Sequence, residues 1–315
     1  MVCRASVGGI GVITNPKSRA NRREPARMRE LAELLGSQGA AVTTHNLDDL
    51  RRTAEIFKAT GIDILGINGG DGTISVTLTT FVEVYGAVPL PNIAILRGGT
   101  MNTVARALGI QGTPHELLLD ITSRYLLGEP LAVVERPILR VGDRCGFIFG
   151  NGAIANFLEA YYATGRPSPL TGATTLIHAI SSSLVRGPFA RELFRRFRGR
   201  VTVDGTTWPV EDFLTLTAAT VPEVGLGFRP FTRCLERAGH FELLGIHCSP
   251  LALVQELPDV YLGRPLRTGK CIGALARAAL IESDDEFSYT IDGDLHRASG
   301  TLRLAAGPTL RLIVP

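Results

Sequence analysis

The segment "LGINGGDGTISV", residues 65–76, passes from one apolar stretch through three glycines and one carboxylate into a second apolar stretch. The first stretch is typical of a buried strand and the second of a helix start. Backbone N–H groups in such a turn can approach a phosphate closely, and a helix N-terminus favours an anion. Asp71 would repel that phosphate unless a cation such as Mg²⁺ lies between them. The alternative is a plain tight turn whose Asp71 caps a helix from Thr73.

Two other segments repeat this design. "RGGTMNTVAR" (97–106) and "TNPKSR" (14–19) also follow strand-like runs, and both carry polar groups suited to phosphate. We expect strands at 9–15, 40–46, 63–68 and 92–99, and helices at 24–39, 48–61, 73–86 and 101–110. Strands that alternate with helices predict a parallel, Rossmann-like sheet. The three loops then lie at the carboxyl ends of strands, where such sheets bind ligands.

The second part of the chain has a different pattern. Alternation with period two predicts strands within 132–152, 199–210, 212–220, 240–248 and 286–315. Asp204-Gly205 and Asp292-Gly293 are typical of tight hairpin turns, and helices are expected at 171–198 and 249–263. We therefore predict an α/β domain over 1–130 and a β-rich, antiparallel sandwich over 131–305. The tail from about 306 to 315 is expected to return to the first domain.

Composition narrows the class of protein. The 315 residues are 45% hydrophobic and 20% charged, which is typical of a globular chain and not of a disordered one. A net charge of +3 is too small to indicate nucleic acid as a partner. The five cysteines lack the close spacing of a metal site. No signal peptide or membrane-spanning run is visible, so we expect a cytoplasmic protein, with peripheral membrane contact still open.

The three loops together resemble the catalytic domain of the diacylglycerol kinase family, which includes sphingosine, ceramide and bacterial lipid kinases. The resemblance rests on "NPKS", "GGDGT" and "GGTMNTVAR", with weaker likeness at "GLGFRPF" (225–231) and "YTIDGD" (289–294). It implies an ATP- and Mg²⁺-dependent kinase that transfers the γ-phosphate to a lipid hydroxyl, as in diacylglycerol, ceramide or a sphingoid base. Two alternatives are a soluble small-molecule kinase related to NAD kinase and a nucleotide-binding homologue without catalysis.

The resemblance also implies roles for particular residues. Asp71 would hold Mg²⁺, and Asp294 would be the base that deprotonates the lipid hydroxyl, with Asp71 as the other candidate base. The nucleotide would contact Asn15, Lys17, Ser18, Thr44, Gly69, Gly70, Asp71, Gly72, Thr73, Gly99, Thr100 and Asn102.

The chain departs from the family pattern at three points. Thr103 follows Asn102 where the family often has aspartate, so contacts with the nucleotide are expected to differ. The family's accessory Mg²⁺ site in the second domain matches "ERAGHFE" (236–242), which lacks the paired carboxylates that a hard cation requires. Asp294 replaces a glutamate and is one methylene shorter, so the acceptor must lie closer or a water must intervene.

Two further segments have open interpretations. "RELFRRFRGR" (191–200) carries five arginines, which suit contact with anionic lipid headgroups or form a solvated helix face and turn. The apolar stretch 170–189 suits either a slot for an acyl chain or a core helix. The six histidines show no metal-ligand spacing, so we expect no transition metal.

Overall fold

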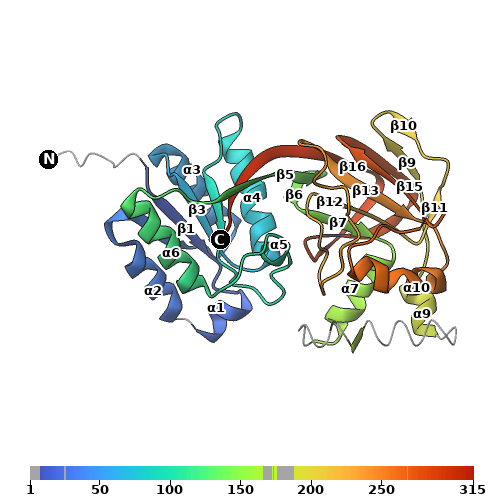
Figure 1. Cartoon of the computed structure of the whole chain (residues 1–315), viewed down its shortest axis with the longest axis horizontal. Helices are drawn as coiled ribbons and strands as arrows, with labels where there is room; N and C mark the ends of the chain where they lie inside the picture. The colour runs from blue at the N-terminus through green and yellow to red at the C-terminus, as the bar shows by residue number, and fades with distance from the viewer. Residues whose placement is uncertain (1–7, 25, 166–171, 173, 176–187, 268) are drawn as a thin grey trace. The chain divides into compact units, whose positions relative to one another are not determined.

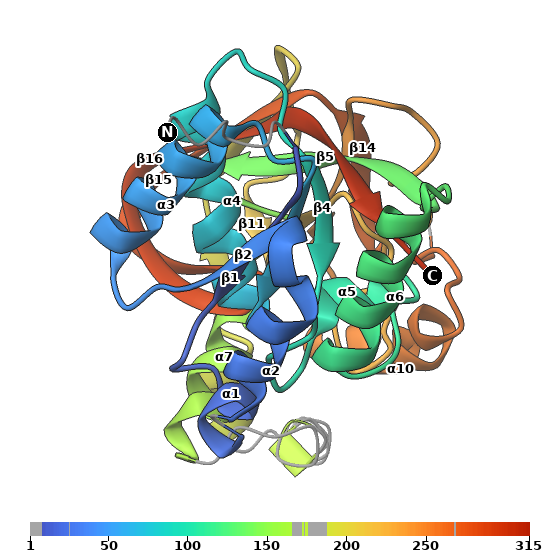
Figure 2. The same cartoon turned by 90° about the vertical axis from the view of Figure 1, so that its left-hand side faces the viewer.

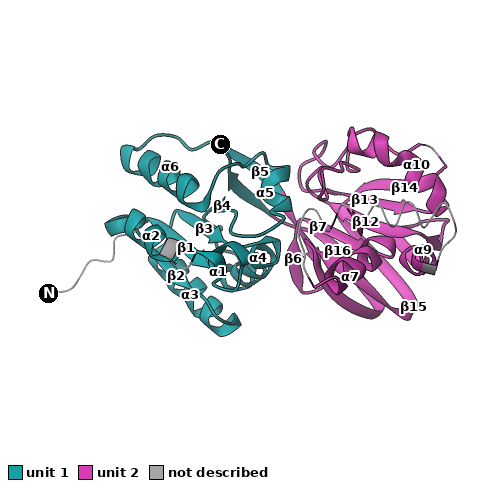
Figure 3. Ribbon diagram, turned by 90° about the horizontal axis from the view of Figure 1, so that it is seen from below, with its two compact units in different colours: residues 1–136, 309–315 teal, residues 137–308 magenta. Residues whose placement is uncertain are grey.

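The computed structural model describes residues 8–24, 26–165, 172, 174–175, 188–267 and 269–315. The chain forms two compact units, residues 1–136 with 309–315 (unit 1) and residues 137–308 (unit 2), coloured separately in Figure 3. The chain passes between them twice, in strand β5 (Val133–Val141) and in strand β16 (Asp294–Ile313).

Unit 1 is built on a parallel sheet in the order β4-β3-β1-β2. Its strands are β1 (Ile10–Thr14), β2 (Gly39–Thr43), β3 (Ile64–Asn68) and β4 (Asn92–Ile95). The end of β16 returns to this sheet, where Leu312 pairs in parallel with Ile93 of β4. The buried strands β1 and β3 consist of β-branched and other apolar residues with few polar groups, as expected for strands covered on both faces.

Helices cover both faces of this sheet, as Figure 2 shows. Those of unit 1 are α1 (Arg19–Arg23), α2 (Ala26–Leu35), the short 3₁₀ turn η1 (Gly36–Gln38), α3 (Leu47–Thr60), α4 (Asp71–Tyr85), α5 (Thr103–Ala107) and α6 (Pro114–Leu127). Helices α2 and α6 share one core with β1, β3 and β4. On the other face Phe57 of α3 lies against β1 at Gly11, where a Cβ atom would be only 2.5 Å from the Phe57 ring.

Unit 2 is mostly antiparallel, with strands hydrogen-bonded along the path β14-β13-β12-β7-β15-β16. Besides β5 and β16 its strands are β6 (Arg144–Gly146), β7 (Ile148–Asn151), β8 (Phe197–Arg198), β9 (Arg200–Val203), β10 (Thr206–Thr207), β11 (Asp212–Phe213), β12 (Thr215–Ala219), β13 (Phe241–Ile246), β14 (Cys271–Ala276) and β15 (Ala278–Ile291). Their inward side chains form one large core that includes Phe149, Phe213, Phe241 and Ile281. The predicted fold class, a parallel α/β part followed by an antiparallel β-rich part, is confirmed.

Both expected hairpin turns are present in unit 2. Asp204-Gly205 joins β9 to β10, and Asp292-Gly293 joins β15 to β16. In each turn both residues have positive φ (46° and 86°, 49° and 96°), which aspartate and glycine tolerate better than other residues do.

The helices of unit 2 differ in part from the prediction. They are α7 (Ala153–Ala163), α9 (Pro188–Leu193) and α10 (Pro250–Tyr261), labelled in Figure 1. Near the end of the predicted helix over 171–198, the structure describes α9, which ends at Leu193, because the chain then turns and Phe197 is buried as part of β8. The apolar stretch 170–189 lies almost wholly outside the described residues.

Candidate active site

The carboxyl ends of β1, β2 and β3 are tied together by backbone hydrogen bonds in unit 1. The N–H of Asn15 donates to the carbonyl of Asn68 (3.1 Å), and the N–H of Thr44 donates to the carbonyl of Thr14 (3.1 Å). Thr44 is half-buried beside the end of β1. The loops after β1 and β3 therefore lie at one edge of the sheet, as the sequence predicted.

Asn15 joins the first loop to the glycine turn. Its amide nitrogen donates to the Thr73 hydroxyl (2.9 Å), and its amide oxygen accepts the backbone N–H of Lys17 (2.9 Å). The Ser18 hydroxyl lies 3.4 Å from the Thr73 hydroxyl. Lys17 is exposed, and its ammonium donates to the carbonyl of His45 (3.2 Å). The structure thus brings together Asn15, Ser18 and Thr73, which are polar side chains from the loop after β1 and from the first turn of α4.

The glycine turns pack backbone against backbone. A Cβ atom at Gly99 would lie 2.3 Å from the Cα of Gly70, and one at Gly98 would lie 2.4 Å from the Asn68 amide oxygen. A Cβ atom at Gly69 would collide with the Thr73 side chain at 2.4 Å. None of these three glycines has positive φ. Glycine is therefore needed at these positions because only glycine allows this close approach.

Asp71 lies in the first turn of α4 and is buried. Its two carboxylate oxygens accept the backbone N–H groups of Thr103 (3.0 Å) and Val104 (3.2 Å), which open α5. The helix starts at Asp71 and has Gly70 as its N-cap, without a side-chain cap. Asp71 therefore does not cap a helix from Thr73. It links the first glycine turn to the second.

Asn102 closes the second glycine turn on itself. Its amide oxygen accepts the N–H of Gly99 (3.0 Å), and its amide nitrogen donates to the carbonyls of Arg97 and Gly99 (3.3 Å each). Arg97 and Asn102 both have positive φ, 56° and 48°, which turns the chain sharply on either side of the glycines. Thr100, within this turn, is half-buried.

Two buried asparagines at the site were not predicted. Asn21, on α1, is 1% exposed and donates to the carbonyls of Asn15 (2.8 Å) and Asn68 (3.2 Å). Asn68 is fully buried at the end of β3. Within the described part of the chain, the amide oxygens of both side chains lack a hydrogen-bond partner. A buried polar atom without a partner is costly, so both oxygens are suited to accept from a ligand or a water.

The residues present fit a Mg²⁺ ion only if that ion arrives with the nucleotide. Across the described residues, no three His, Cys, Asp or Glu side chains form a group that could hold a metal. Mg²⁺ is often held by one or two carboxylates together with substrate phosphates and waters. Asp71 is the carboxylate of the glycine turn, and its oxygens already accept two backbone N–H groups. It could supply at most part of such a shell.

Asp294 lies in unit 2 as the first residue of β16, directly after the Asp292-Gly293 turn, and its side chain is exposed. The turn is held firmly. The buried carboxylate of Asp292 accepts the N–H groups of Phe147 (3.0 Å) and Ile148 (2.8 Å), and the Tyr162 hydroxyl donates to the Gly293 carbonyl (2.8 Å). Asp292 was seen in the sequence only as a turn residue, yet it fixes the position from which Asp294 projects.

The electrostatic environment of Asp294 suits a proton acceptor. Neighbouring protein displaces part of its hydration and so raises the pKa of its carboxyl group, while the positive charge of Arg144 lowers that pKa. Desolvation lowers the pKa of His296, two residues further along β16, and the charge of Arg144 lowers it further. His296 also lies against Tyr289, with ring centroids 5.4 Å apart.

The basic segment 191–200 is only partly available for a partner. Arg196 pairs with Asp212 (2.8 Å) and donates to the carbonyl of His247, so its side chain stabilises the fold of unit 2. Phe197 is buried in the core of unit 2, and Phe194 packs on a smaller apolar cluster. The aromatic side chains of this segment are therefore not a membrane-facing set. Arg191, Arg195 and Arg198 remain exposed.

Comparison with known proteins agrees with this arrangement. Residues 9–127, which contain all three loops, match the diacylglycerol kinase catalytic domain. The resemblance to the diacylglycerol kinase family is confirmed.

One curated protein, named probable lipid kinase YegS, from Salmonella arizonae, is 26% identical over 174 residues. The match covers 54% of this chain, and the chain spans about half the length of that relative (54%).

Solved structures show the same fold. The structure of a diacylglycerol kinase from Bacillus anthracis matches with a TM-score of 0.64 and 18% identity, over 98% of this chain and 97% of that chain. A second structure from the same organism matches with a TM-score of 0.70 and 17% identity over the same shares. At this identity the likeness establishes the fold alone.

Proposed function

We propose that this protein is a lipid kinase that transfers the γ-phosphate of ATP to a lipid hydroxyl. The observation that carries the proposal is the assembly of three loops at the sheet edge of unit 1, inside the segment that matches the diacylglycerol kinase catalytic domain. Asn15, Ser18 and Thr73 are joined there by side-chain contacts, and the glycine turns lie against one another.

Unit 1 would hold the nucleotide. The N-terminus of α4 has a glycine N-cap and no side-chain cap, so its field and its first N–H groups can serve phosphate oxygens. Asn15, Ser18 and Thr73 add neutral hydrogen-bonding groups, and Lys17 adds a positive charge beside them. Mg²⁺ bound with ATP would offset the charge on the transferred phosphoryl group.

The two carboxylates would have different roles. Asp294 would accept the proton of the acceptor hydroxyl while the hydroxyl oxygen forms its bond to the γ-phosphorus and ADP leaves. Its raised pKa makes it a better proton acceptor than an ordinary aspartate. Asp71 would act mainly as a positioning residue, because its oxygens hold the start of α5. Its use as the base is the less favoured assignment.

The proposed acceptor and place of reaction rest on the likeness to that family. Lipid kinases meet their substrates at a membrane surface, and the exposed Arg191, Arg195 and Arg198 suit anionic headgroups. None of the described helices combines the length and the hydropathy needed to span a membrane. Peripheral contact and a cytoplasmic location stay predictions. Diacylglycerol, ceramide and sphingoid bases all offer a primary hydroxyl and remain candidate acceptors.

The test is transfer of labelled γ-phosphate from ATP to a panel of lipids in mixed micelles, with and without Mg²⁺, beside a panel of soluble alcohols that includes NAD. One labelled lipid that requires Mg²⁺ is the expected result. Label only on a soluble acceptor would contradict the lipid assignment. ATP binding without any labelled product would indicate a nucleotide-binding protein without catalysis.

A further inference from the structure

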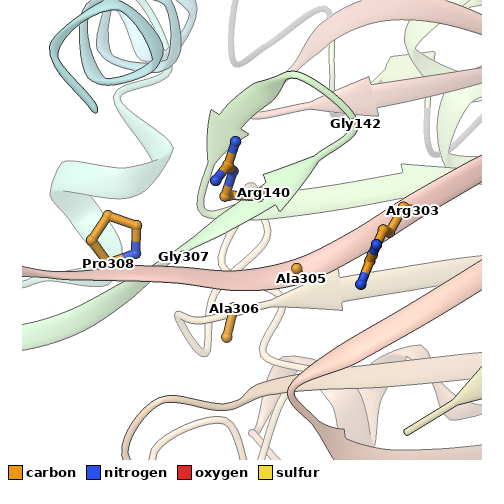
Figure 4. Close-up of a pocket in the computed structure, with 7 residues that line it drawn as sticks. All are labelled: Arg140, Gly142, Arg303, Ala305, Ala306, Gly307 and Pro308. Atoms are coloured by element: carbon orange, nitrogen blue, oxygen red, sulfur yellow. The ribbon is translucent and has the colours of Figure 1, made fainter. Parts of the chain in front are cut away.

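None of the residues that line a cavity in unit 2 has a role in the reaction proposed above. It has a volume of about 540 Å³ and is lined by Arg140, Gly142, Arg303, Ala305, Ala306, Gly307 and Pro308. The lining comes from β5, from the turn after it and from β16. Figure 4 shows Arg140 and Arg303 as the large side chains among these residues, and the others are small.

Strand geometry places the two arginines on one face of the β5–β16 ribbon. Side chains alternate along a strand, so Arg303, Ala305 and Gly307 of β16 share a face. A Cβ atom at Gly307 would lie 3.0 Å from the Cγ atom of Arg140, so Arg140 projects over the same face. Ala305 and Gly307 then form a floor without large side chains, and one guanidinium group stands at each side of it (Figure 4).

Neither guanidinium group is neutralised. Both side chains are exposed, and neither forms a hydrogen bond or an ion pair with any residue in the described ranges. Other arginines on strands of unit 2 do pair, as Arg200 does with Glu211 (3.7 Å) and Arg297 with Glu286 (3.4 Å). The acid nearest in sequence, Asp143, has a 92% exposed side chain and lies 4.0 Å from Arg144. The cavity therefore carries an unbalanced positive charge.

The backbone around the cavity is fixed. The N–H of Gly142 donates to the carbonyl of Arg303 (2.8 Å), and the N–H of Ala306 donates to the carbonyl of Arg277 (2.8 Å). The turn after β5 is thereby held against β16, so the two arginines start from anchored positions. An anchored pair loses less freedom when it binds a ligand than two arginines on mobile loops would.

We propose that this cavity binds a phosphate group through Arg140 and Arg303. A guanidinium group presents paired N–H donors that match phosphate oxygens, and its charge persists at every physiological pH. The small residues of the floor leave room for a phosphate and for the atoms that follow it. The group would belong either to the headgroup of an anionic phospholipid or to a free phosphate compound. The residues that line the cavity are not among those assigned to the kinase reaction, so the proposal does not depend on that reaction.

The test compares three variants of the full chain at fixed ionic strength. Arg140→Gln/Arg303→Gln removes both charges. Ala305→Leu places a larger side chain on the floor of the cavity and keeps both arginine charges. Arg29→Gln/Arg311→Gln, at two exposed arginines of unit 1, changes the net charge by the same amount.

The soluble probes are inorganic phosphate and glycerol 3-phosphate in calorimetry. The membrane probes are vesicles of phosphatidylcholine with phosphatidylglycerol, and of phosphatidylcholine alone, in sedimentation.

The proposal predicts that the first two variants weaken binding of at least one phosphate probe about tenfold or more, while the unit 1 control binds as the parent does. Loss confined to phosphatidylglycerol vesicles would identify a lipid headgroup, and loss for the soluble probes as well would identify a free phosphate. Equal binding by all variants would overturn the proposal. So would a loss in the arginine variant that Ala305→Leu does not share, because the charges would then act without the cavity.

Discussion

Asp71, in the glycine turn after β3, accepts the backbone N–H of Thr103, at the start of α5, at a distance of 3.0 Å, and its other oxygen accepts the N–H of Val104. One buried carboxylate therefore joins two loops that lie 32 residues apart in sequence. A carboxylate that accepts two N–H groups at a helix start also complements the helix dipole. The geometry of the two glycine turns depends on this link.

Asp71→Asn should weaken both the fold of unit 1 and nucleotide binding. The asparagine side chain keeps one acceptor oxygen. Its NH₂ group replaces the other oxygen, so one of the two backbone N–H groups loses its acceptor. We expect a loss of about 1–3 kcal/mol in the free energy of unfolding, measured by urea denaturation. Asp48→Asn, at an exposed acid in the first turn of α3, is the matched control and should change little. Full stability together with undiminished ATP affinity would exclude the positioning role.

Gly99→Ala should disturb the contact between the two turns. Its Cβ atom would lie 2.3 Å from the Cα of Gly70, so the backbone of one turn must shift to make room for it. Gly70→Ala is the comparison, because its Cβ atom would be 3.2 Å from Gly99 and needs a smaller shift. We expect ATP binding, measured by equilibrium dialysis, to fall further in the Gly99 variant. An equal or reversed order would show that close packing of the turns is not the reason for glycine there.

Asp292→Ala should reduce both stability and activity, because the carboxylate that fixes the turn before Asp294 is lost. The N–H groups of Phe147 and Ile148 would be left without their acceptor, which costs about 1–3 kcal/mol. The second hairpin offers a matched control. Asp204 begins a turn of the same kind and accepts the N–H groups of Arg277 and Ala278.

Asp204→Ala should therefore lower the unfolding midpoint but leave phosphoryl transfer by the folded protein unchanged. If both variants lost activity in proportion to stability alone, Asp292 would have no positioning role.

The pH dependence of transfer should follow the ionisation of Asp294. Because desolvation raises its pKa above the usual 3.8, the acid limb of kcat/KM should lie above that value. Arg144 favours the ionised form, so Arg144→Gln should raise this pKa and move the acid limb to higher pH. Arg277→Gln, at an exposed arginine between β14 and β15, is the control. A limb that stays in place in the Arg144 variant would refute the electrostatic coupling.

The same pKa shift has a consequence for stability. A carboxyl group whose pKa is raised by folding binds its proton more tightly in the folded state than in the unfolded state. Its ionised form therefore costs stability above its unfolded pKa, and that cost vanishes as the pH falls below it. Asp294→Asn should be at least as stable as the parent at neutral pH in thermal denaturation. A marked loss of stability would indicate a structural role for Asp294.

The parallel sheet and the position of the three loops could be predicted because each strand and each glycine turn is a local signal. The start of α6 carries a local signal as well, since Thr113 and Glu116 form a capping box around Pro114. The hydrogen bonds of Asp71 could not be predicted, because they join segments that meet only in the folded chain. For the same reason Asn21 and the anchoring role of Asp292 were not found from the sequence.

The most direct measurement is transfer of labelled γ-phosphate to the lipid panel by the parent protein, by Asp294→Asn and by Asp284→Asn, an exposed acid of β15. Our account predicts one labelled lipid that requires Mg²⁺, normal labelling by the Asp284 variant, and loss of labelling in the Asp294 variant while ATP binding is retained. Labelling that persists in Asp294→Asn would contradict the assignment of the base. Failure of the parent to label any lipid while binding ATP would contradict the lipid kinase itself.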